Sequence, residues 1–394
     1  MVQTVKLRDI VEVNTGTKNP SRWPDIPFKY VDVSAVDNVE KKINGVRTLI
    51  GSEAPSRARK VICADDILVS TVRPNLNAVA KVSTELDGQI ASTGFCVLRA
   101  EKQVLPEYLF FFVRSPRFIL NLSSLVAGAM YPAVTDKQVM DQFIPLPSVP
   151  EQRRIVDILS RAESIVRLRR EVQMKTNDLI PVLFLDMFGD PATNPKGWQV
   201  LPVKDFVARF EGGKNIQAGG DGLSELRILK VSAVTSGTYI ETEAKPAPAD
   251  YKPPNSYFVK EGDLLFSRAN TEQLVGATAL VETTNGKTLL PDKLWRFVWA
   301  KPVAPQYIHA LFQSGAVRKE LGKLSTGTSA SMRNISQGKL FGLELPIAPI
   351  EKQRQFAECI EQIRSIHARQ ENALQKAETI FASVIARAFD GSAT

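Results

Sequence analysis

The sequence predicts an α+β protein in which two homologous globular domains are joined by two long antiparallel helices as a pseudo-twofold internal repeat. The first observation is a duplication in the 394-residue chain: Gly-Thr-Lys-Asn at residues 16–19 returns as Gly-Gly-Lys-Asn at residues 212–215. The second is that each copy is rich in predicted strands first and in predicted helices later. The third is that each copy closes on a long polar segment with the periodicity of an amphipathic helix.

The duplication runs through both copies in one order. Four further matches follow the first: VSAV at 33–36 and 231–234, DILVS at 66–70 and DLLFS at 263–267, PEYL at 106–109 and PQYI at 305–308, and residues 128–147 against 327–346 without a gap. Solenoid repeats are roughly 20–50 residues long, so a period this long indicates two copies of one module. We therefore predict globular domains at residues 1–147 and 193–346, and helical spacers at residues 148–192 and 347–394.

Within each copy, short apolar runs bounded by Gly, Pro, Asn and Asp predict strands. These runs are residues 28–36, 67–72, 90–98, 227–234, 264–267 and 295–299. Helices are predicted at residues 107–113, 116–125 and 306–324, because a proline stands at the first helical turn of each copy. A Gly-rich polar stretch follows in both copies, at residues 127–133 and 326–331, where loops that carry recognition residues are common.

The two closing segments, residues 151–188 and 351–389, predict long helices. In the first, the a and d positions of a heptad are Ile155, Ile158, Ala162, Ile165, Val172 and Leu179, and Leu159 and Val166 widen the stripe. In the second, one face carries Phe356, Ile360, Ile363, Ile366, Ala373, Leu374, Ala377, Ile380 and Val384. Pro181 predicts a kink or a restart in the first helix, because proline lacks a backbone donor and clashes with the preceding turn. Matching apolar seams predict that the helices pair.

Composition narrows the class of protein. Fifty Lys and Arg against 42 Asp and Glu give a net charge of +8, which favours a polyanionic partner. Three isolated cysteines indicate neither a disulfide framework nor a zinc ribbon. The charged N-terminus does not read as a secretory signal, and no run approaches the ~18 apolar residues of a membrane span. We expect a cytoplasmic protein without a membrane partner.

Signals for catalysis are weak. Pro24-Asp25 followed by Glu40-Lys41-Lys42 has the loose PD…ExK spacing of metal-dependent nucleases, but the second group lies in a polar turn instead of a buried strand. Residues 285–288, Asn-Gly-Lys-Thr, resemble the end of a phosphate-binding loop without its first glycine, and we interpret them as a hairpin turn. The only histidines, His309 and His367, are interpreted as packing or surface residues. No catalytic residue, metal site or cofactor is therefore expected in this chain.

The junctions between each globular domain and its helix carry a resemblance to a known family. Residues 144–155 read IPLPSVPEQRRI and residues 345–354 read LPIAPIEKQR, while Gly197-Trp198 followed by Leu201 opens the second copy. They are similar to the PLPP-x-x-EQ entry into the conserved helices, and to the start of a target recognition domain, in specificity subunits of type I restriction-modification enzymes. The resemblance covers the whole chain.

The resemblance implies a non-catalytic DNA-reading subunit. Each target recognition domain would read one half of a bipartite target in double-stranded DNA, and the helix pair would set the gap between the halves. Two methyltransferase subunits would dock on it, and restriction subunits with a motor would join the complex. S-adenosylmethionine, Mg²⁺ and ATP are expected on those partner subunits. An alternative is a type IIB-like complex with cutting and methylation in one partner chain; another, of a different class, is a coiled-coil adaptor that does not bind DNA.

Reading residues are nominated by chemistry and position, because Lys and Arg suit phosphates while Arg, Lys, Asn, Gln, Ser and Thr suit base edges. In the first domain they are Lys18, Asn19, Arg22, Arg57, Arg59, Arg73, Asn75, Asn77, Tyr131 and Lys137. In the second they are Lys214, Asn215, Gln217, Arg268, Asn270, Lys293, Arg333 and Asn334. The repeated Gly-x-Lys-Asn motif is the leading candidate because both copies keep it, although its glycine and asparagine also suit a turn.

Overall fold

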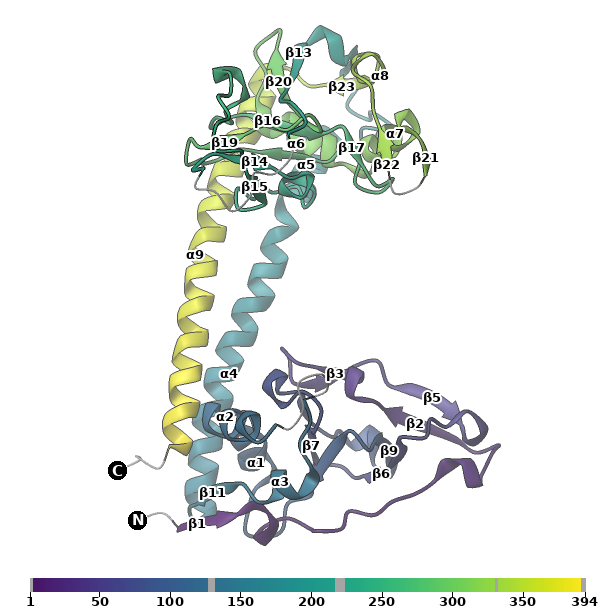
Figure 1. Cartoon of the computed structure of the whole chain (residues 1–394), viewed down its shortest axis with the longest axis vertical. Coiled ribbons are helices and arrows are strands. Elements are labelled where there is room, and N and C mark those ends of the chain that lie inside the picture. The colour runs from purple at the N-terminus through teal and green to yellow at the C-terminus, as the bar shows by residue number, and fades with distance from the viewer. Residues whose placement is uncertain (1–2, 127–131, 217–223, 330–331, 391–394) are drawn as a thin grey trace. The chain divides into compact units, whose positions relative to one another are not determined.

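The chain divides into two compact units in a computed structural model that describes residues 3–126, 132–216, 224–329 and 332–390. Unit 1 comprises Met1–Glu171 and Glu371–Thr394, and unit 2 comprises Val172–Gln370. Each unit contains mixed strands and short helices together with parts of two long helices (Figure 1). The prediction of an α+β protein with two globular domains and long helices is confirmed.

Unit 1 begins with strands and ends on helices. Its strands are β1 Gln3–Lys6, β2 Pro27–Val31, β3 Val36–Asp37, β4 Lys42–Ile43, β5 Arg47–Ile50, β6 Ala58–Ile62, β7 Ile67–Ser70, β8 Val79–Lys81, β9 Gln89–Ser92, β10 Phe95–Leu98 and β11 Phe143–Leu146. Its helices are α1 Pro106–Phe112, α2 Pro116–Ser124, α3 Asp136–Met140 and the first part of α4 Val149–Asn177, and the end of α9 Ile350–Phe389 also belongs to it.

Unit 2 also begins its globular part with strands and ends on helices. Its strands are β12 Gln199–Pro202, β13 Val207–Gly212, β14 Arg227–Leu229, β15 Ala244–Pro246, β16 Leu264–Ser267, β17 Ala269–Asn270, β18 Thr278–Leu280, β19 Thr288–Leu289, β20 Leu294–Trp299, β21 Thr326–Ser329, β22 Met332–Asn334 and β23 Glu344–Ile347. Its helices are α5 Leu179–Phe188, α6 Pro305–Gln313, α7 Gly315–Leu324 and α8 Gln337–Phe341, with the end of α4 and most of α9.

Sheet topology shows that the two units are copies of one fold. The first and last strands of each globular part pair antiparallel, as β1 with β11 and β12 with β23. The order β10-β7-β8 in unit 1 matches β20-β16-β18 in unit 2. A parallel pair also recurs, as β2 with β9 and β14 with β19. The main difference is that unit 2 adds the sheet β17-β22-β21, where unit 1 has an isolated bridge from Val72 to Ala133.

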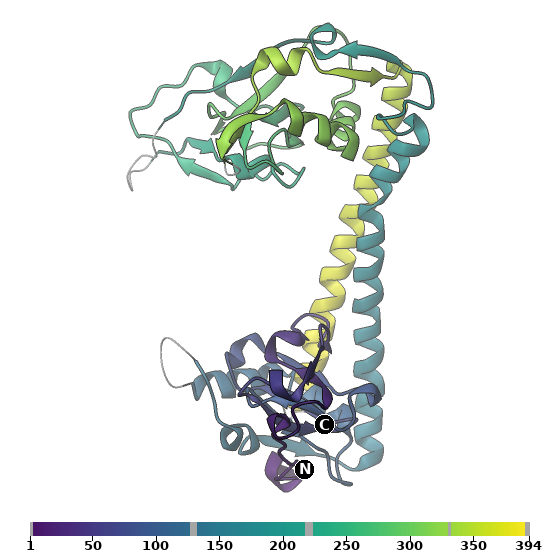
Figure 2. The same cartoon turned by 90° about the vertical axis from the view of Figure 1, so that its right-hand side faces the viewer.

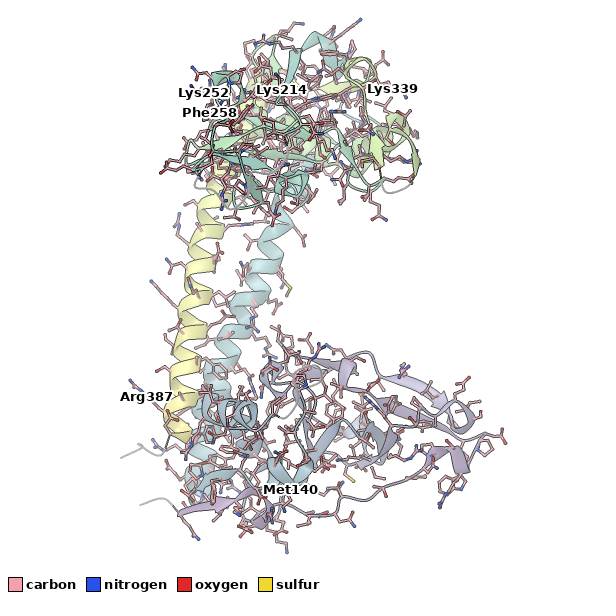
Figure 3. All side chains as sticks on the ribbon, viewed as in Figure 1. Met140, Lys214, Lys252, Phe258, Lys339 and Arg387 are labelled. Carbon is pink, nitrogen blue, oxygen red and sulfur yellow. The ribbon has the colours of Figure 1, made fainter. Side chains whose placement is uncertain are left out.

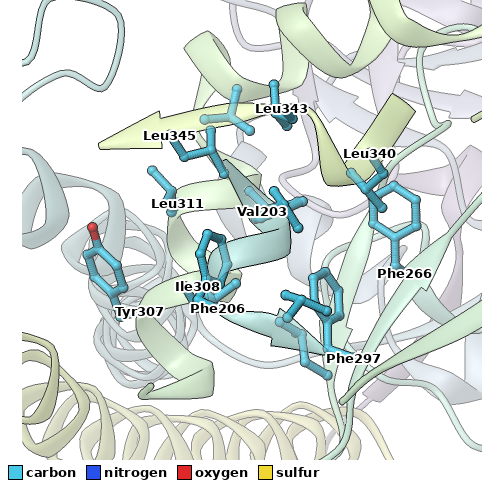
Figure 4. Close-up of a cluster of buried hydrophobic side chains, with 14 of the residues drawn as sticks. Val203, Phe206, Phe266, Phe297, Tyr307, Ile308, Leu311, Leu340, Leu343 and Leu345 are labelled. Carbon is cyan, nitrogen blue, oxygen red and sulfur yellow. The ribbon is translucent and has the colours of Figure 1, made fainter. Parts of the chain in front are cut away.

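Each unit has its own hydrophobic core, and both long helices contribute to it. In unit 2, side chains of α6 such as Tyr307 and Ile308 pack with Phe266 and Leu345 (Figure 4), and Phe356 of α9 belongs to the same cluster. In unit 1, the corresponding cluster takes its helix residues from the start of α4 and the end of α9. The start of one long helix therefore lies beside the end of the other within each unit, so the helices are antiparallel (Figures 1 and 2).

The first closing helix restarts, as Pro181 predicts. α4 ends at Asn177 and α5 begins at Leu179, so Pro181 occupies the third position of the new helix. Proline is tolerated there because the first turn of a helix has no internal acceptor for its N–H groups. The break lies upstream of the proline because its ring would clash with the carbonyl four residues earlier. α9 is continuous over Ile350–Phe389.

The predicted seam of α4 was shifted by one position. Leu159 and Val166 are the buried residues, whereas Ile158 and Ile165 are 43% and 53% exposed. Both pairs have the seven-residue spacing of a heptad, so spacing alone cannot tell which of them meets the partner helix. The shift leaves apolar side chains of α4 on its surface.

Several local predictions were wrong at turns. The VSAV repeat was assigned to strands, yet Val33–Ala35 and Val231–Val234 both form 3-10 helices. In the first copy the Asp32 side chain accepts a hydrogen bond from Val33 N at 2.8 Å and so caps the turn. A run of β-branched residues indicates burial, and burial suits a turn that packs its alanine inside as well as it suits a strand.

Two long predicted elements are divided in the structure. Residues 90–98 form parts of β9 and β10, because Ser92 Oγ accepts a hydrogen bond from Gly94 N at 3.2 Å and a turn results. Residues 306–324 form α6 and α7, because Ser314 Oγ caps a new helix at Val317 N. The interpretation of residues 285–288 as a hairpin was also wrong, because β18 and β19 on either side pair with β16 and β14 and not with each other.

The two copies do not align without a gap near their ends. α3 and α8 differ by 201 residues, whereas α1 and α6 differ by 199, so the second copy has two extra residues in the intervening loop. The structural partner of Pro346 is consequently Pro145, not Pro147, since these prolines face equivalent strands β12 and β1. The first junction contains Pro145 and, two residues later, Pro147 in a Leu-Pro dipeptide, and the Leu-Pro match selected the wrong proline.

Candidate DNA interface

A buried ion pair is repeated at the same place in both units. In unit 1 the fully buried Asp66 carboxylate accepts hydrogen bonds from Arg99 Nε and Arg99 Nη2, both at 2.8 Å. In unit 2 Arg296 Nη1 donates to Asp263 Oδ2 at 2.8 Å. Each aspartate also accepts a backbone N–H from three residues before it, at 2.7 and 2.8 Å. The repeated aspartate therefore fixes the start of β7 or β16.

A buried tyrosine holds the exit strand of each unit. Tyr108 Oη donates to Pro145 O at 2.9 Å, and Tyr307 Oη donates to Pro346 O at 3.1 Å. Burial raises the pKa of Tyr307 to about 12, so the phenol stays protonated and remains a donor. Proline has no N–H, so the carbonyl is the only backbone group through which either proline can form a hydrogen bond, and the tyrosine hydroxyl is its partner.

A buried glutamine anchors each long helix to its globular part. Gln152 Oε1 accepts from Leu105 N at 2.8 Å, and Gln152 Nε2 donates to the carbonyls of Gln103 and Pro147, both at 2.9 Å. Gln353 Oε1 accepts from Ala304 N at 3.0 Å, and its Nε2 donates to Ala348 O at 2.8 Å. The glutamine of the junction motif is thus a clamp between the helix start and the loop before α1 or α6.

The first copy of Gly-x-Lys-Asn lies in a loop beside β6. Gly16 has φ +89°, and Lys18 N donates to Arg59 O at 2.8 Å. Asn19 caps a short 3-10 helix through a 3.2 Å hydrogen bond from Ser21 N. The Lys18 side chain is exposed, with its Nζ 5.0 Å from the ring centroid of Trp23.

The second copy of the motif has a different environment. Gly213 N donates to Pro291 O at 3.0 Å, and a Cβ at Gly213 would lie only 1.8 Å from Leu290 O. The glycine is needed here for close backbone approach, whereas Gly16 is needed for a left-handed turn. Lys214, labelled in Figure 3, and Asn215 are exposed, and neither side chain has a polar partner in the part of the chain that the structure describes.

Backbone hydrogen bonds join most of the nominated residues of unit 1 into one edge. Lys18 N binds Arg59 O, Thr93 N binds Arg57 O at 2.8 Å, and Arg73 N binds Pro132 O at 2.8 Å. Thr71 N donates to Gly94 O at 2.9 Å, and this hydrogen bond connects the Thr93–Arg57 contact to the Arg73–Pro132 contact. These contacts bring seven nominated residues to one edge of the unit. We call this group the first loop edge: Lys18, Asn19, Arg22, Arg57, Arg59, Arg73 and Asn75. The guanidinium of Arg59 donates to local carbonyls, and Arg22, Arg57, Arg73 and Asn75 are exposed.

The remaining nominees of unit 1 lie differently. Asn77 is buried; its Nδ2 donates to Val113 O at 2.9 Å and its Oδ1 accepts from Lys41 Nζ at 3.1 Å. Both ends of its amide are therefore engaged inside the unit, and we leave it out of the DNA surface. Lys137 is exposed on α3. Tyr131 lies outside the described residues.

The nominated residues of unit 2 form an equivalent edge. Gly213 N binds Pro291 O, Arg268 N binds Lys293 O at 3.1 Å, and Ile335 N binds Arg268 O at 2.9 Å. Strands β17 and β22 place Asn270 opposite Arg333, and Ala269 opposite Asn334. The second loop edge therefore consists of Lys214, Asn215, Arg268, Asn270, Lys293, Arg333 and Asn334. Gln217 lies outside the described residues.

Two arginines of the second loop edge are held in defined orientations. Arg268 Nε donates to Asp292 O at 2.7 Å, and its guanidinium carbon lies 5.6 Å from the Trp295 ring centroid. Arg333 Nη2 lies 3.5 Å from Glu272 Oε2, and both arginine side chains are a little under one third exposed. A partly buried, oriented guanidinium loses less conformational entropy on binding than a free one, so these side chains suit base or phosphate recognition.

The weak catalytic signals find no support in the geometry. Glu40 forms an ion pair with Arg170 at 3.5 Å, and Lys41 Nζ donates to Asn77 O at 2.6 Å. Within the described ranges, no group of three or more His, Cys, Asp or Glu side chains is placed to hold a metal ion. His309 is half-buried beside Thr278, with 2.9 Å between Nδ1 and Oγ1, and desolvation of its ring lowers its pKa to about 4.

The sequence reasoning missed Trp23. This tryptophan is 42% exposed and carries Lys18 over its ring, beside the first loop edge. Exposed aromatic rings next to cations recur at nucleic-acid surfaces, where they stack on bases or sugars. An aromatic residue three positions after a Pro in a basic loop is the signal that could have identified it.

The fold and the two loop edges define a protein with two homologous domains. Each domain has a surface of cationic and amide side chains, and each packs against parts of the long helices. Residues 1–175 match the model of the type I restriction modification DNA specificity domain. The specificity subunit of the type I restriction enzyme EcoKI from Escherichia coli strain K12 is 24% identical over 84% of this chain and 76% of its own length. That of StySPI from Salmonella potsdam is also 24% identical, over the same shares.

Solved structures agree with these relatives. A chain from a structure of complex assembly and conformational transition of the type I restriction-modification system has 26% identity and a TM-score of 0.68, covering 98% of this chain and 97% of that chain. The S subunit of a type I system from M. genitalium, at 9% identity and a TM-score of 0.54, shares the fold over 99% of this chain and 96% of its own. The chain is thus similar to type I restriction-modification specificity subunits, to the family model over residues 1–175 and to the relatives and the first solved structure along most of its length. None of its described helices is both long and apolar enough to cross a membrane.

Proposed function

We propose that this chain gives a type I restriction-modification complex its DNA sequence specificity, with each unit reading one half of a bipartite target. The similarity to type I specificity subunits supports this assignment, and the observation that carries it is the pair of loop edges. In both units, residues that are distant in sequence and suited to phosphates or base edges are joined into one surface by backbone hydrogen bonds.

The loop edges divide by chemistry. The first loop edge is mostly cationic, with Lys18, Arg22 and Arg57 exposed. The second loop edge has side chains in defined orientations. Arg268 lies beside the ring of Trp295, and Asn270 and Arg333 lie opposite each other on the paired strands β17 and β22. Arginine binds guanine and asparagine binds adenine in two-point contacts, each worth about 1–3 kcal/mol of discrimination. This difference in chemistry between the two loop edges supports the proposal that they read different half-sites.

Partner subunits would dock on the helices. α4 exposes Ile158, Ile165 and Leu168 at 43%, 53% and 55%. Clustered exposed apolar side chains on a helix favour a protein interface. We assign this surface to two methyltransferase subunits, with restriction subunits joining them; S-adenosylmethionine, Mg²⁺ and ATP would act on those partners. In this proposal the chain itself cleaves and methylates nothing, and the helix pair sets the gap between half-sites.

The test is to express the chain with its methyltransferase partner and to map adenine methylation by sequencing. Arg333→Ala with Asn270→Ala should relax or abolish one half of the methylated motif and leave the other half unchanged. Lys18→Ala with Arg57→Ala should weaken only the other half, and by less per residue, because phosphate contacts act on all sequences alike. Arg209→Ala is the matched control, since this exposed arginine pairs with Glu211 and belongs to neither loop edge.

Loss of specificity in both halves from either double variant would contradict independent reading by the two units. An unmethylated genome, together with no mobility shift on DNA when the partners are present, would instead favour the coiled-coil adaptor.

A further inference from the structure

A cavity of about 830 Å³ lies in unit 1 and shares no lining residue with the first loop edge. It is lined by the turn between β3 and β4, by α1 and α2, and by the unit 1 parts of α4 and α9. A volume of this size is typical of a site for a small organic ligand. Its apolar wall includes Phe110, Ile119 and Phe381.

The cavity carries an excess of positive charge. Its lining includes six cationic side chains, Lys41, Lys42, Lys81, Arg114, Arg167 and Arg170, and three carboxylates, Glu40, Glu163 and Glu378. Lys81 and Arg170 each pair with two carboxylates, and Arg114 pairs with Glu163. Lys41, Lys42 and Arg167 have no carboxylate within ion-pair distance among the residues that the structure describes.

Arg114 is an incompletely satisfied buried cation. Its side chain is 7% exposed, and its guanidinium carbon lies 4.7 Å from the ring centroid of Phe110 and 5.5 Å from that of Phe381. Nη2 binds Glu163, but Nη1 is buried without a partner within the described part of the chain. A buried guanidinium N–H that lacks an acceptor costs stability, so such a group in a cavity wall marks a place for one.

Lys41 completes the pair of cations. Its Nζ donates to Asn77 O at 2.6 Å and to Asn77 Oδ1 at 3.1 Å, which are both uncharged acceptors. Burial and the nearby Arg114 lower the pKa of Lys41 to about 8, against an opposing effect of Asp37. Two like charges brought together in a partly dry site repel each other, and an anion between them would remove that cost.

The second unit shows that the fold does not require this charge. Its matching cavity, about 870 Å³, has the same walls from α6, α7, α9 and α5. There Gln313 occupies the position of Arg114, one residue before the serine that caps the next helix, and it donates to Thr278 O at 2.8 Å. Its charged lining is Asp190, Glu282 and Arg364. The cationic character belongs to unit 1 alone.

We propose that the cavity of unit 1 binds a small organic anion through a phosphate or carboxylate group held between Arg114 and Lys41. The planar guanidinium offers a directional donor and the ammonium a point charge, the combination that recognises an oxyanion. The apolar wall would receive the rest of the ligand. This site shares no residue with the first loop edge and does not depend on the proposed reading of half-sites.

Calorimetric titration of the full chain at fixed ionic strength tests the proposal, with inorganic phosphate, ATP and citrate as separate probes. One saturable site is expected; preference for ATP over phosphate would show that the apolar wall contributes, and preference for citrate would identify a carboxylate ligand. Arg114→Gln, which copies the second unit, and Lys41→Met should each weaken binding about ten- to a hundredfold, the effect of losing one hydrogen bond to a charged group. Arg47→Gln, outside the cavity, is the control.

The proposal fails if no probe binds at millimolar concentration, or if Lys41→Met and Arg47→Gln weaken binding equally. Lys41→Met also decides the question should Arg114→Gln prevent folding, because it leaves the Arg114–Glu163 pair intact. Displacement of bound ATP by duplex DNA, with equal loss of DNA affinity in Lys41→Met, would assign the cavity to the DNA surface and overturn the small-ligand site.

Discussion

Replacing Gln353 with leucine should loosen unit 2 where α9 joins its globular part. Gln353 is 2% exposed, and leucine has a similar size, so the change mainly removes hydrogen bonds. Two backbone groups would lose their partners: Ala304 N, which now donates to Oε1 at 3.0 Å, and Ala348 O, which now accepts from Nε2 at 2.8 Å.

The expected size follows from the two groups left without partners. Leaving a buried donor or acceptor unsatisfied costs about 1–3 kcal/mol each, and the apolar side chain recovers part of that. We therefore expect about 2–4 kcal/mol of lost local stability. Because 1.4 kcal/mol corresponds to a factor of ten, amides near the start of α6 and α9 should exchange about 30- to 1000-fold faster.

Hydrogen–deuterium exchange read by mass spectrometry measures this directly, because peptides from each region report separately. Gln355→Leu is the matched control, since Gln355 lies two residues along the same helix and is exposed. The reasoning is refuted if Gln353→Leu accelerates exchange at α6 no more than Gln355→Leu does.

Two further predictions concern unit 2. Burial lowers the pKa of His309 to about 4, below the ~6.5 of an unfolded chain, so the stability that this residue contributes should be complete above pH 6.5 and lost as the pH falls toward 4. NMR titration of the two histidines measures this pKa, and the His309→Gln variant identifies which signal belongs to His309. A midpoint near ~6.5 for that signal would contradict the prediction. Gly213→Ala should destabilise the unit by about 1–3 kcal/mol or more, because the new Cβ would lie 1.8 Å from Leu290 O, whereas Gly315→Ala, with open space around it, should be nearly neutral; equal thermal unfolding temperatures would disprove the close-approach argument.

The sequence predicts the order of elements well where periodicity and end signals coincide. Prolines at the first turn located the starts of α1, α2 and α6 to within one residue, because proline both begins a helix and cannot continue one. Turns inside apolar runs were harder to predict, since β-branched residues report burial and not backbone angle. The α4 seam was missed by one position for a related reason: Ile158 and Leu159 are equally apolar, and only the partner helix decides which of them is buried.

The loop edges were partly predictable because residue chemistry and repeat position together selected residues that tertiary contacts bring side by side. The cavity of unit 1 was not predictable, since Arg114 follows α1 as an ordinary basic residue would, and its burial depends on Phe381 from the other end of the chain. No local pattern records a contact between residues that are 267 positions apart.

Repetition in this chain marks the framework more than the recognition surface. Asp66 and Asp263 make the same ion pair, Tyr108 and Tyr307 bind equivalent prolines, and Gln152 with its copy anchors equivalent helices. The repeated Gly-x-Lys-Asn, by contrast, contacts different strands in the two units, so its letters alone do not demonstrate a shared role. Two copies that must read different half-sites need one framework and two surfaces, and the residues that differ at matched positions are therefore the better candidates for specificity.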